Sequence, residues 1–226
     1  MNYKTLFYFD IETVGEHINF NTFKNKDLRG AELFKKKFDK NPWMSERSDS
    51  IEDAYIDNSP IMSTFGKIVC VSFGYFTDKN PKGYSLNSIH GDNEEKLVNE
   101  VAVLFNKVYD KNMILSGFRI NNFDIPWLVH KMTKYDIKLP KILEIYDKKP
   151  WEIQSFDLAD KWKFGFRYFS SLDDVCYELG IDSPKDAIDG SMVHSTYWNE
   201  NELEKIKTYC EKDVYASMLV GKKMLQ

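Results

Sequence analysis

The segment LFYFDIETV, residues 6–14, places two carboxylates inside a run of aliphatic and aromatic residues that is typical of a buried β-strand. Successive side chains of a strand point to opposite faces of the sheet, so Asp10 and Glu12 point to the same face. Two carboxylates on one buried face repel each other and resist removal from water. The rest of the chain must therefore supply positive charge, either as basic side chains or as bound cations.

Length and composition indicate an ordinary globular protein. A chain of 226 residues can form one full core, and we expect a single domain over residues 1–226. No run approaches the roughly 18 apolar residues of a membrane span, and the N-terminus does not resemble a signal peptide. Cys70, Cys176 and Cys210 lack the spacing of metal ligands, which favours reduced core residues of a cytoplasmic protein.

The net charge of −4 argues against a protein that grips duplex DNA through a large basic surface. Residues 15–60 form an excursion after the first strand, with one helix expected at about Leu28–Phe38. Between Lys24 and Arg47, eight basic residues oppose four acidic ones. A solvated face is one interpretation of this run. A flap that closes over a nucleic-acid strand is the other.

The remaining segments predict an α/β fold. Strands are expected at residues 67–77, 83–90, 113–120 and 155–162, and helices at 94–110, 124–137, 171–181 and 201–225. The turn signal NPKG makes the second and third strands an antiparallel hairpin. Asp92 with Glu95 predicts a capping box, Asp124 a helix cap, and Ser170 or Ser171 the start of a helix that ends at Gly180. We expect a mixed sheet of about five strands, the first three antiparallel, flanked by helices.

Two further carboxylates stand in apolar surroundings, Asp124 after the fourth strand and Asp213 on the last helix. Each has a plain alternative, because Asp124 can cap its helix and Asp213 can be a surface acid. Four converging carboxylates repel strongly unless cations lie among them, and oxygen ligands suit hard divalent cations. Tyr209 lies four residues before Asp213 on the same helical face, which would place a phenol beside such a site.

Three segments in order along the chain, FDIET, GFRINNFDIPWL and YCEKD, resemble the exonuclease motifs of the DEDD superfamily. The Y-x-x-x-D spacing resembles the DEDDy branch, which includes the proofreading domain of family-B DNA polymerases and related stand-alone exonucleases. The resemblance covers most of the chain outside the excursion. It implies a ribonuclease H-like fold and a 3′–5′ exonuclease that removes nucleoside monophosphates from single-stranded DNA 3′ ends.

The same resemblance implies roles for five residues. Asp10, Glu12 and Asp213 would hold one Mg²⁺ or Mn²⁺ ion, which carries the attacking water. Asp10 would bridge to a second such ion, with Asp124 helping through water. Tyr209 would orient the attacking water, because a phenol with a pKa near 10 is a poor general base.

One position departs from the resemblance. Family-B proofreading domains usually carry Asn where this chain has Arg119. The neighbouring Asn121 and Asn122 are candidates to compensate. The guanidinium of Arg119 is suited to binding a phosphate, or it simply reaches solvent. Three aromatic side chains near the motifs are candidates for stacking on bases, with core packing as the alternative for each: Phe65, Phe123 and Trp127.

Substrate and partners stay open at this stage. RNA is an alternative to DNA, because recognition of the 2′-hydroxyl depends on a few contacts. An inactive nucleic-acid-binding module is a second alternative. The sequence carries no polymerase motif, so a proofreading role requires a separate polymerase or repair complex as partner, and no membrane is expected. His194 lies far from Asp213 in sequence, and we interpret it as an ordinary surface or loop residue.

Overall fold

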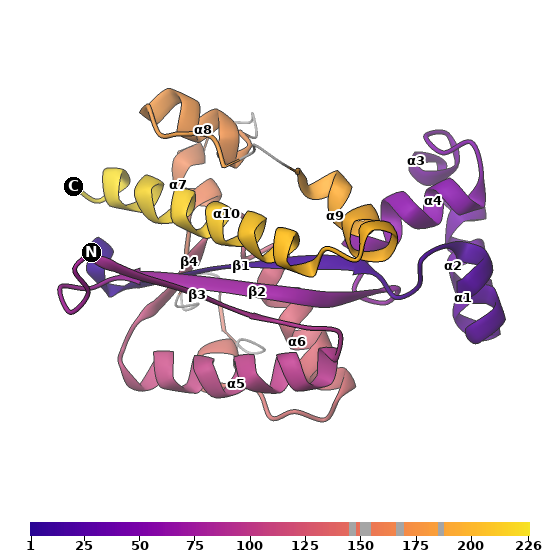
Figure 1. Cartoon of the computed structure of the whole chain (residues 1–226), viewed down its shortest axis with the longest axis horizontal. Helices are drawn as coiled ribbons and strands as arrows, with labels where there is room; N and C mark the ends of the chain where they lie inside the picture. The colour runs from indigo at the N-terminus through magenta and orange to yellow at the C-terminus, as the bar shows by residue number, and fades with distance from the viewer. Residues whose placement is uncertain (145–147, 150–154, 166–169, 185–187) are drawn as a thin grey trace.

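The computed structural model describes residues 1–144, 148–149, 155–165, 170–184 and 188–226, and within them a five-stranded sheet has the order β3-β2-β1-β4-β5 (Figure 1). The strands are β1 (Leu6–Gly15), β2 (Gly66–Phe76), β3 (Tyr84–His90), β4 (Ile114–Gly117) and β5 (Ser155–Asp157). Strand β2 pairs antiparallel with β1 and β3, whereas β4 pairs parallel with β1 and β5. The predicted mixed sheet with its first three strands antiparallel is confirmed.

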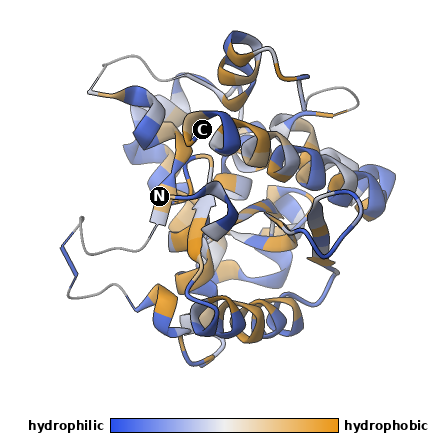
Figure 2. Ribbon diagram, turned by 90° about the vertical axis from the view of Figure 1, so that its left-hand side faces the viewer, coloured by the Kyte–Doolittle hydropathy of each residue, from blue (hydrophilic) through white to orange (hydrophobic). Residues whose placement is uncertain are grey.

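Helices cover both faces of the sheet (Figure 1). One face carries α5 (Glu94–Asp110) and α6 (Asp124–Lys134). The other carries α10 (Leu203–Met224), preceded by α9 (Val193–Ser195), with α7 (Leu158–Lys163) and α8 (Leu172–Leu179) packed beside it. The central strands are largely hydrophobic, and hydrophobic and hydrophilic residues alternate along the helices around them (Figure 2). Among the described residues, no helix is both long and apolar enough to cross a membrane.

Strand β1 is buried on both of its faces. One face gives three side chains to the core shared with α5 and α6: Phe7, Phe9 and Ile11. On the other face, Tyr8 and Val14 pack with residues of α10. Asp10 and Glu12 lie between Tyr8 and Val14 at every second position of the strand. All four side chains therefore share one face, and the two carboxylates face the α10 layer.

Helix α10 approaches β1 closely because Gly221 faces the ring of Tyr8. A Cβ atom at position 221 would collide with the Tyr8 hydroxyl. Glycine removes that obstacle and lets the helix lie directly on the strand. The close approach brings the earlier turns of α10, which carry Tyr209 and Asp213, over the acidic part of β1.

The excursion folds into four helices instead of the single helix expected at Leu28–Phe38. They are α1 (Phe20–Lys26), α2 (Leu28–Lys40), α3 (Pro42–Ser45) and α4 (Ile51–Asn58), and we call residues 20–58 the helical insert. The insert forms an aromatic core together with Phe65, which precedes β2: Phe20, Phe23, Phe34, Tyr55 and Phe65. Leu33 is 49% exposed, because Gly30, Ala31 and Phe34 form the buried face of α2.

Local boundaries confirm some predictions and correct others. Ser171 forms a capping box with Asp174, and α8 ends at Gly180 as expected. Helix α5, however, is capped by Asn93, and the Asp92 carboxylate instead accepts a hydrogen bond from the Tyr197 hydroxyl. The fourth strand stops at residue 117, and β5 has only three residues because α7 begins directly after it.

The prediction of a surface position for His194 is wrong, because its side chain is only 4% exposed. Nδ1 accepts a hydrogen bond from the Gly15 amide at 3.0 Å, and Nε2 donates to the Ile18 carbonyl at 3.1 Å. These partners require a neutral ring with its proton on Nε2, and burial lowers the pKa of the ring. His194 therefore ties α9 to the segment that joins β1 to the helical insert.

Replacing His194→Ala should lower the free energy of unfolding by about 2 kcal/mol, because the Gly15 amide loses its buried acceptor. Urea denaturation measures the change. His130→Ala is the matched control, since that ring is exposed and should contribute about 0.5 kcal/mol or less. Equal losses in the two variants would contradict a stabilising role for the buried ring.

Candidate active site

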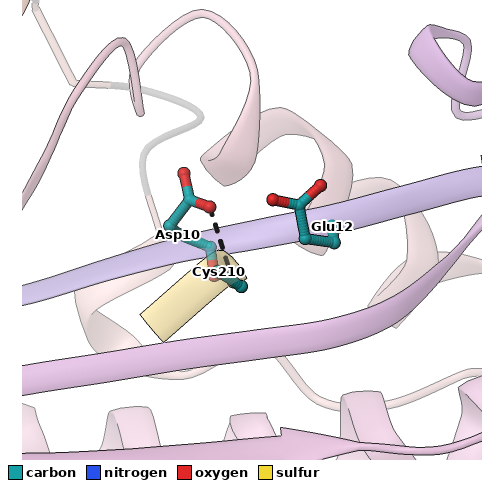
Figure 3. Close-up of side chains that lie close together, drawn as sticks. All are labelled: Asp10, Glu12 and Cys210. Carbon is teal, nitrogen blue, oxygen red and sulfur yellow. Dashed lines mark hydrogen bonds between the residues drawn. The ribbon is translucent and has the colours of Figure 1, made fainter. Parts of the chain in front are cut away.

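Acidic side chains from β1, α6 and α10 converge where α10 crosses the central strand. Carboxylate oxygens of Asp10 and Glu12 and the sulfur of Cys210 lie within 4.8 Å of one another (Figure 3). Asp124 and Asp213 are close enough for their charges to raise the pKa of Asp10. The structure therefore brings together the four carboxylates that the sequence singles out.

Asp124 does not cap its helix as expected. The cap position belongs to Phe123, which makes no capping hydrogen bond with its side chain. Asp124 is the first residue of α6, is 2% exposed, and accepts a hydrogen bond from the Ile11 amide at 3.0 Å. Since Ile11 lies between Asp10 and Glu12, this bond fixes the start of α6 against the acidic part of β1.

Burial and mutual repulsion raise the pKa values of these acids. For Asp10 and Glu12 the largest cause is burial, followed by the charges of neighbouring carboxylates. Burial likewise raises the pKa of Asp124 to about 7, against the opposing effect of hydrogen bonds from backbone amides. Within the part of the chain that the structure describes, no Lys, Arg or His forms an ion pair with these three acids.

The donor set fits a divalent cation. Buried carboxylate oxygens without a basic partner are the ligands that hard cations prefer. A bound cation would supply the missing positive charge and reverse the upward shift in the pKa values of Asp10 and Glu12. The sulfur of Cys210 is a softer donor than these oxygens.

The hydroxyl of Tyr209 stays protonated near neutral pH. Its side chain is 8% exposed, and burial raises its pKa, with further increases from the charges of Asp213, Glu12 and Asp10. A phenol whose pKa is raised is a hydrogen-bond donor and cannot serve as a general base. This agrees with an orienting role for Tyr209.

Two residues at the site were missed by sequence reasoning. The first is Cys210, whose thiol lies 3.4 Å from Oδ2 and 3.5 Å from the carbonyl oxygen of Asp10 and can donate its one proton to either. A thiol in an apolar helix is usually a core residue, so its position beside Tyr209 in YCEKD was the only available signal.

The second missed residue is Asp157, which is 1% exposed at the end of β5. Its carboxylate accepts hydrogen bonds from the amides of Arg119 at 3.1 Å and Asn121 at 2.9 Å, and it also caps α7. Asp157 thereby holds the loop that leads to Asp124. The available signal was a lone acid at the end of a short apolar strand.

Arg119 adopts a left-handed backbone conformation, with φ of 64°. Asn enters this region more readily than most residues, which gives a physical reason for the Asn found in the related domains. Here the Arg119 amide donates a hydrogen bond to Asp157, which holds the backbone. The exposed guanidinium of Arg119 donates to the Ser170 carbonyl at 3.2 Å. Asn122 is exposed, whereas the side chain of Asn121 bonds to its neighbours in β5 and α7.

The three candidate stacking residues differ in exposure. Phe65 and Trp127 are each 3% exposed, Phe65 in the core of the helical insert and Trp127 in the core beneath α6. Phe123 is half-buried, and its ring centre lies 5.8 Å from that of Trp127. Of the three, Phe123 therefore offers the most accessible ring beside Asp124.

Residues 60–225 match the model of a family described as a predicted 3′–5′ exonuclease related to the exonuclease domain of PolB. The match spans more than half of the chain, and the protein belongs to this family. It includes α6 and α10, and with them Asp124, Tyr209 and Asp213. Strand β1, with Asp10 and Glu12, precedes the matched region.

A solved family B DNA polymerase from the hyperthermophilic archaeon Pyrobaculum calidifontis is similar in structure, with a TM-score of 0.59 and 13% sequence identity. The similarity covers 97% of this chain and 24% of the polymerase chain. It shows the fold, which is the ribonuclease H-like α/β architecture expected from the motifs. No curated protein sequence gives a significant match.

Replacing Glu12→Gln should stabilise the metal-free protein at pH 8 by about 1–2 kcal/mol, because it removes a buried repulsive charge. The pKa of Glu12 is raised in the folded state, so its ionisation destabilises the fold increasingly as the pH rises. The gain should therefore be larger at pH 8 than at pH 5, as measured by denaturation in EDTA.

Glu100→Gln serves as the control, because this exposed residue of α5 loses the same charge away from the site. It should change stability little at either pH. A loss of stability in Glu12→Gln at pH 8 would show that Glu12 has a stabilising positive partner, and would contradict the account.

Proposed function

We propose that this protein is a metal-dependent 3′–5′ exonuclease of the DEDDy type, which removes nucleoside monophosphates from single-stranded DNA 3′ ends. The observation that carries the proposal is the convergence of the buried Glu12 and Asp124 with the half-buried Asp10 and Asp213. Membership of an exonuclease family supports the reaction type. The Y-x-x-x-D spacing of Tyr209 and Asp213 on α10 supports the branch.

Two divalent ions, Mg²⁺ or Mn²⁺, are the cofactors that we assign to this site. Asp10, Glu12 and Asp213 would hold one ion, and Asp10 with Asp124 the other. Such ions, when bound, lower the pKa of an attacking water and stabilise negative charge on the phosphate and on the leaving 3′ oxygen. The preference for oxygen ligands and the raised pKa values of the acids both support this assignment.

The protein's own groups have separate tasks in this proposal. Tyr209 keeps its proton and donates a hydrogen bond that orients the attacking water. Cys210 holds the Asp10 carboxylate in place. Asp157 holds the loop before α6, so that Asp124 keeps its bond to β1.

The substrate contacts that we propose come from the second motif. Phe123 offers a half-buried ring on which a terminal base can stack. Arg119 is exposed beside this motif, and its guanidinium suits a phosphate of the strand. DNA is preferred over RNA because the matched family is related to the exonuclease domain of a DNA polymerase.

We place the reaction in the cytoplasm, with a separate polymerase or repair complex as a possible partner. Cys70, Cys176 and Cys210 are buried and free, which fits a reducing compartment. The sequence itself carries no polymerase motif.

A gel assay with 5′-labelled DNA and RNA single strands, in Mg²⁺, Mn²⁺ or EDTA, tests the proposal. With either metal, we expect the DNA strand to shorten from its 3′ end and to give a ladder of products. In EDTA the strand should remain intact. The double variant Asp10→Ala, Glu12→Ala should lower the rate by roughly three orders of magnitude or more, because the cations lose their principal ligands.

The matched control is Glu95→Ala, Glu100→Ala, which removes two exposed carboxylates from α5 and should cleave normally. Faster cleavage of RNA would overturn the proposed substrate and leave the chemistry intact. Folded wild-type protein that binds strands but cleaves neither with any metal would identify an inactive binding module and overturn the proposal.

A further inference from the structure

Helix α2 of the helical insert concentrates positive charge at one end of the sheet (Figure 1). Residues 48–58 of the insert add four acids, Asp49, Glu52, Asp53 and Asp57, so the insert as a whole is neutral. Between residues 24 and 47, basic residues outnumber acidic ones by eight to four, although the whole chain has a net charge of −4. All eight basic side chains are exposed: Lys24, Lys26, Arg29, Lys35, Lys36, Lys37, Lys40 and Arg47. The protein outside residues 24–47 is correspondingly more negative.

Three of these cations form a stripe along α2. Arg29, Lys36 and Lys40 are spaced seven and four residues apart, which places them on one face of a helix, with the exposed Glu32 between the first two. That face is opposite the buried one, which contains Ala31 and Phe34. We call these three residues the α2 stripe.

The cations of the insert are largely available to an external anion. Of the eight basic residues, Lys35 forms an ion pair among the described residues, with the Asp39 carboxylate at 2.8 Å. Arg47 lies over the Trp43 ring at 5.0 Å. The α2 stripe has no carboxylate partner within the described part of the chain.

The insert is a packed structure that can hold these charges in fixed positions. Its helices share a buried aromatic core, in which Phe34 and Tyr55 are fully enclosed. Glu52 of α4 accepts a hydrogen bond from the Phe20 amide at 3.0 Å, and Tyr55 accepts one from the His17 amide at 3.2 Å. The first bond joins α4 to the start of α1, and the second joins the insert to the segment that leaves β1.

A cavity of about 480 Å³ lies at one end of the α2 stripe. Its charged lining consists of two cations, Arg29 and Lys134, and two carboxylates, Glu16 and Asp27, so the α2 stripe supplies the excess positive charge for a phosphate. Lys134 ends α6, the helix that begins with Asp124, and Glu16 follows Glu12 by four residues. Four extended residues span about 13 Å, so the cavity lies near the acidic cluster.

We propose that the α2 stripe and this cavity bind the phosphate backbone of the substrate strand on the 5′ side of its 3′ terminal nucleotides. The exposed cations match the charge of the phosphates, and neutralising them releases counterions from the strand. The orientation of the strand rests on the proposed exonuclease function. Binding itself does not require cleavage.

Fluorescence anisotropy in EDTA tests the surface without cleavage. The probes are labelled thymidine oligonucleotides of four and twenty residues, titrated with the whole protein at several salt concentrations. The triple variant Arg29→Gln, Lys36→Gln, Lys40→Gln should bind the longer strand at least about tenfold more weakly at low salt. Its log–log salt slope should fall by about 2, since three phosphate contacts are lost. Binding of the shorter strand should change little.

The control is Lys79→Gln, Lys82→Gln, Lys111→Gln, which removes the same charge from exposed positions at the opposite end of the sheet. It should retain the wild-type salt slope. An equal loss of affinity in both variants would show that binding depends only on net charge, and would overturn the proposal. Unchanged binding by the stripe variant would also overturn it. The single variant Lys36→Glu repeats the test with one change at an exposed position, should the triple variant fold poorly.

Cleavage of the shorter strand with Mg²⁺ separates this inference from the proposed function. The stripe variant should cleave the four-residue strand at the wild-type rate. If wild-type protein cleaves nothing, the proposed function fails, and the anisotropy comparison still decides whether the α2 stripe binds the strand.

Discussion

The repulsion between Asp10 and Glu12 on the central strand is the constraint on which the arrangement of the molecule depends. Glu12 is buried and Asp10 is half-buried on the same face of β1, so neither carboxylate is fully hydrated. The elements packed against this part of the strand add further carboxylates, Asp124 from α6 and Asp213 from α10. The fold thus accepts an unfavourable charge in its interior, which cations of high charge density can compensate.

Much of this was predictable from periodicity and motif order. Alternation on β1 put Asp10 and Glu12 on one face, and helical spacing put Tyr209 beside Asp213. The helical insert was harder, because short helices are stabilised by tertiary packing and only weakly by their own sequence. Its start signals were nevertheless visible as capping residues: Asn19, Asp27, Asn41 and Ser50. The contacts of His194 and Cys210 could not be predicted, because their partners are distant along the chain. His194 and Gly15 are 179 positions apart, and Cys210 and Asp10 are 200 apart.

The distribution of charge gives the molecule two different surfaces. The acidic cluster beneath α10 suits cations, whereas the exposed basic side chains of α2 suit phosphates. The insert follows β1 directly, and His194 fixes the connection between them. A strand held by the insert would therefore be positioned relative to Asp10 and Glu12 by a short and well-packed connection. In the proposed arrangement, a protein of net negative charge would bind a polyanion locally.

The most direct test of the central claim is anomalous diffraction from crystals soaked in Mn²⁺. The account predicts anomalous peaks coordinated by carboxylate oxygens of Asp10 and Glu12 in the wild-type protein, and their loss in Asp10→Asn. A site that stays empty at saturating Mn²⁺, or that is filled by a lysine or arginine side chain, would contradict the view that these buried acids exist to hold cations.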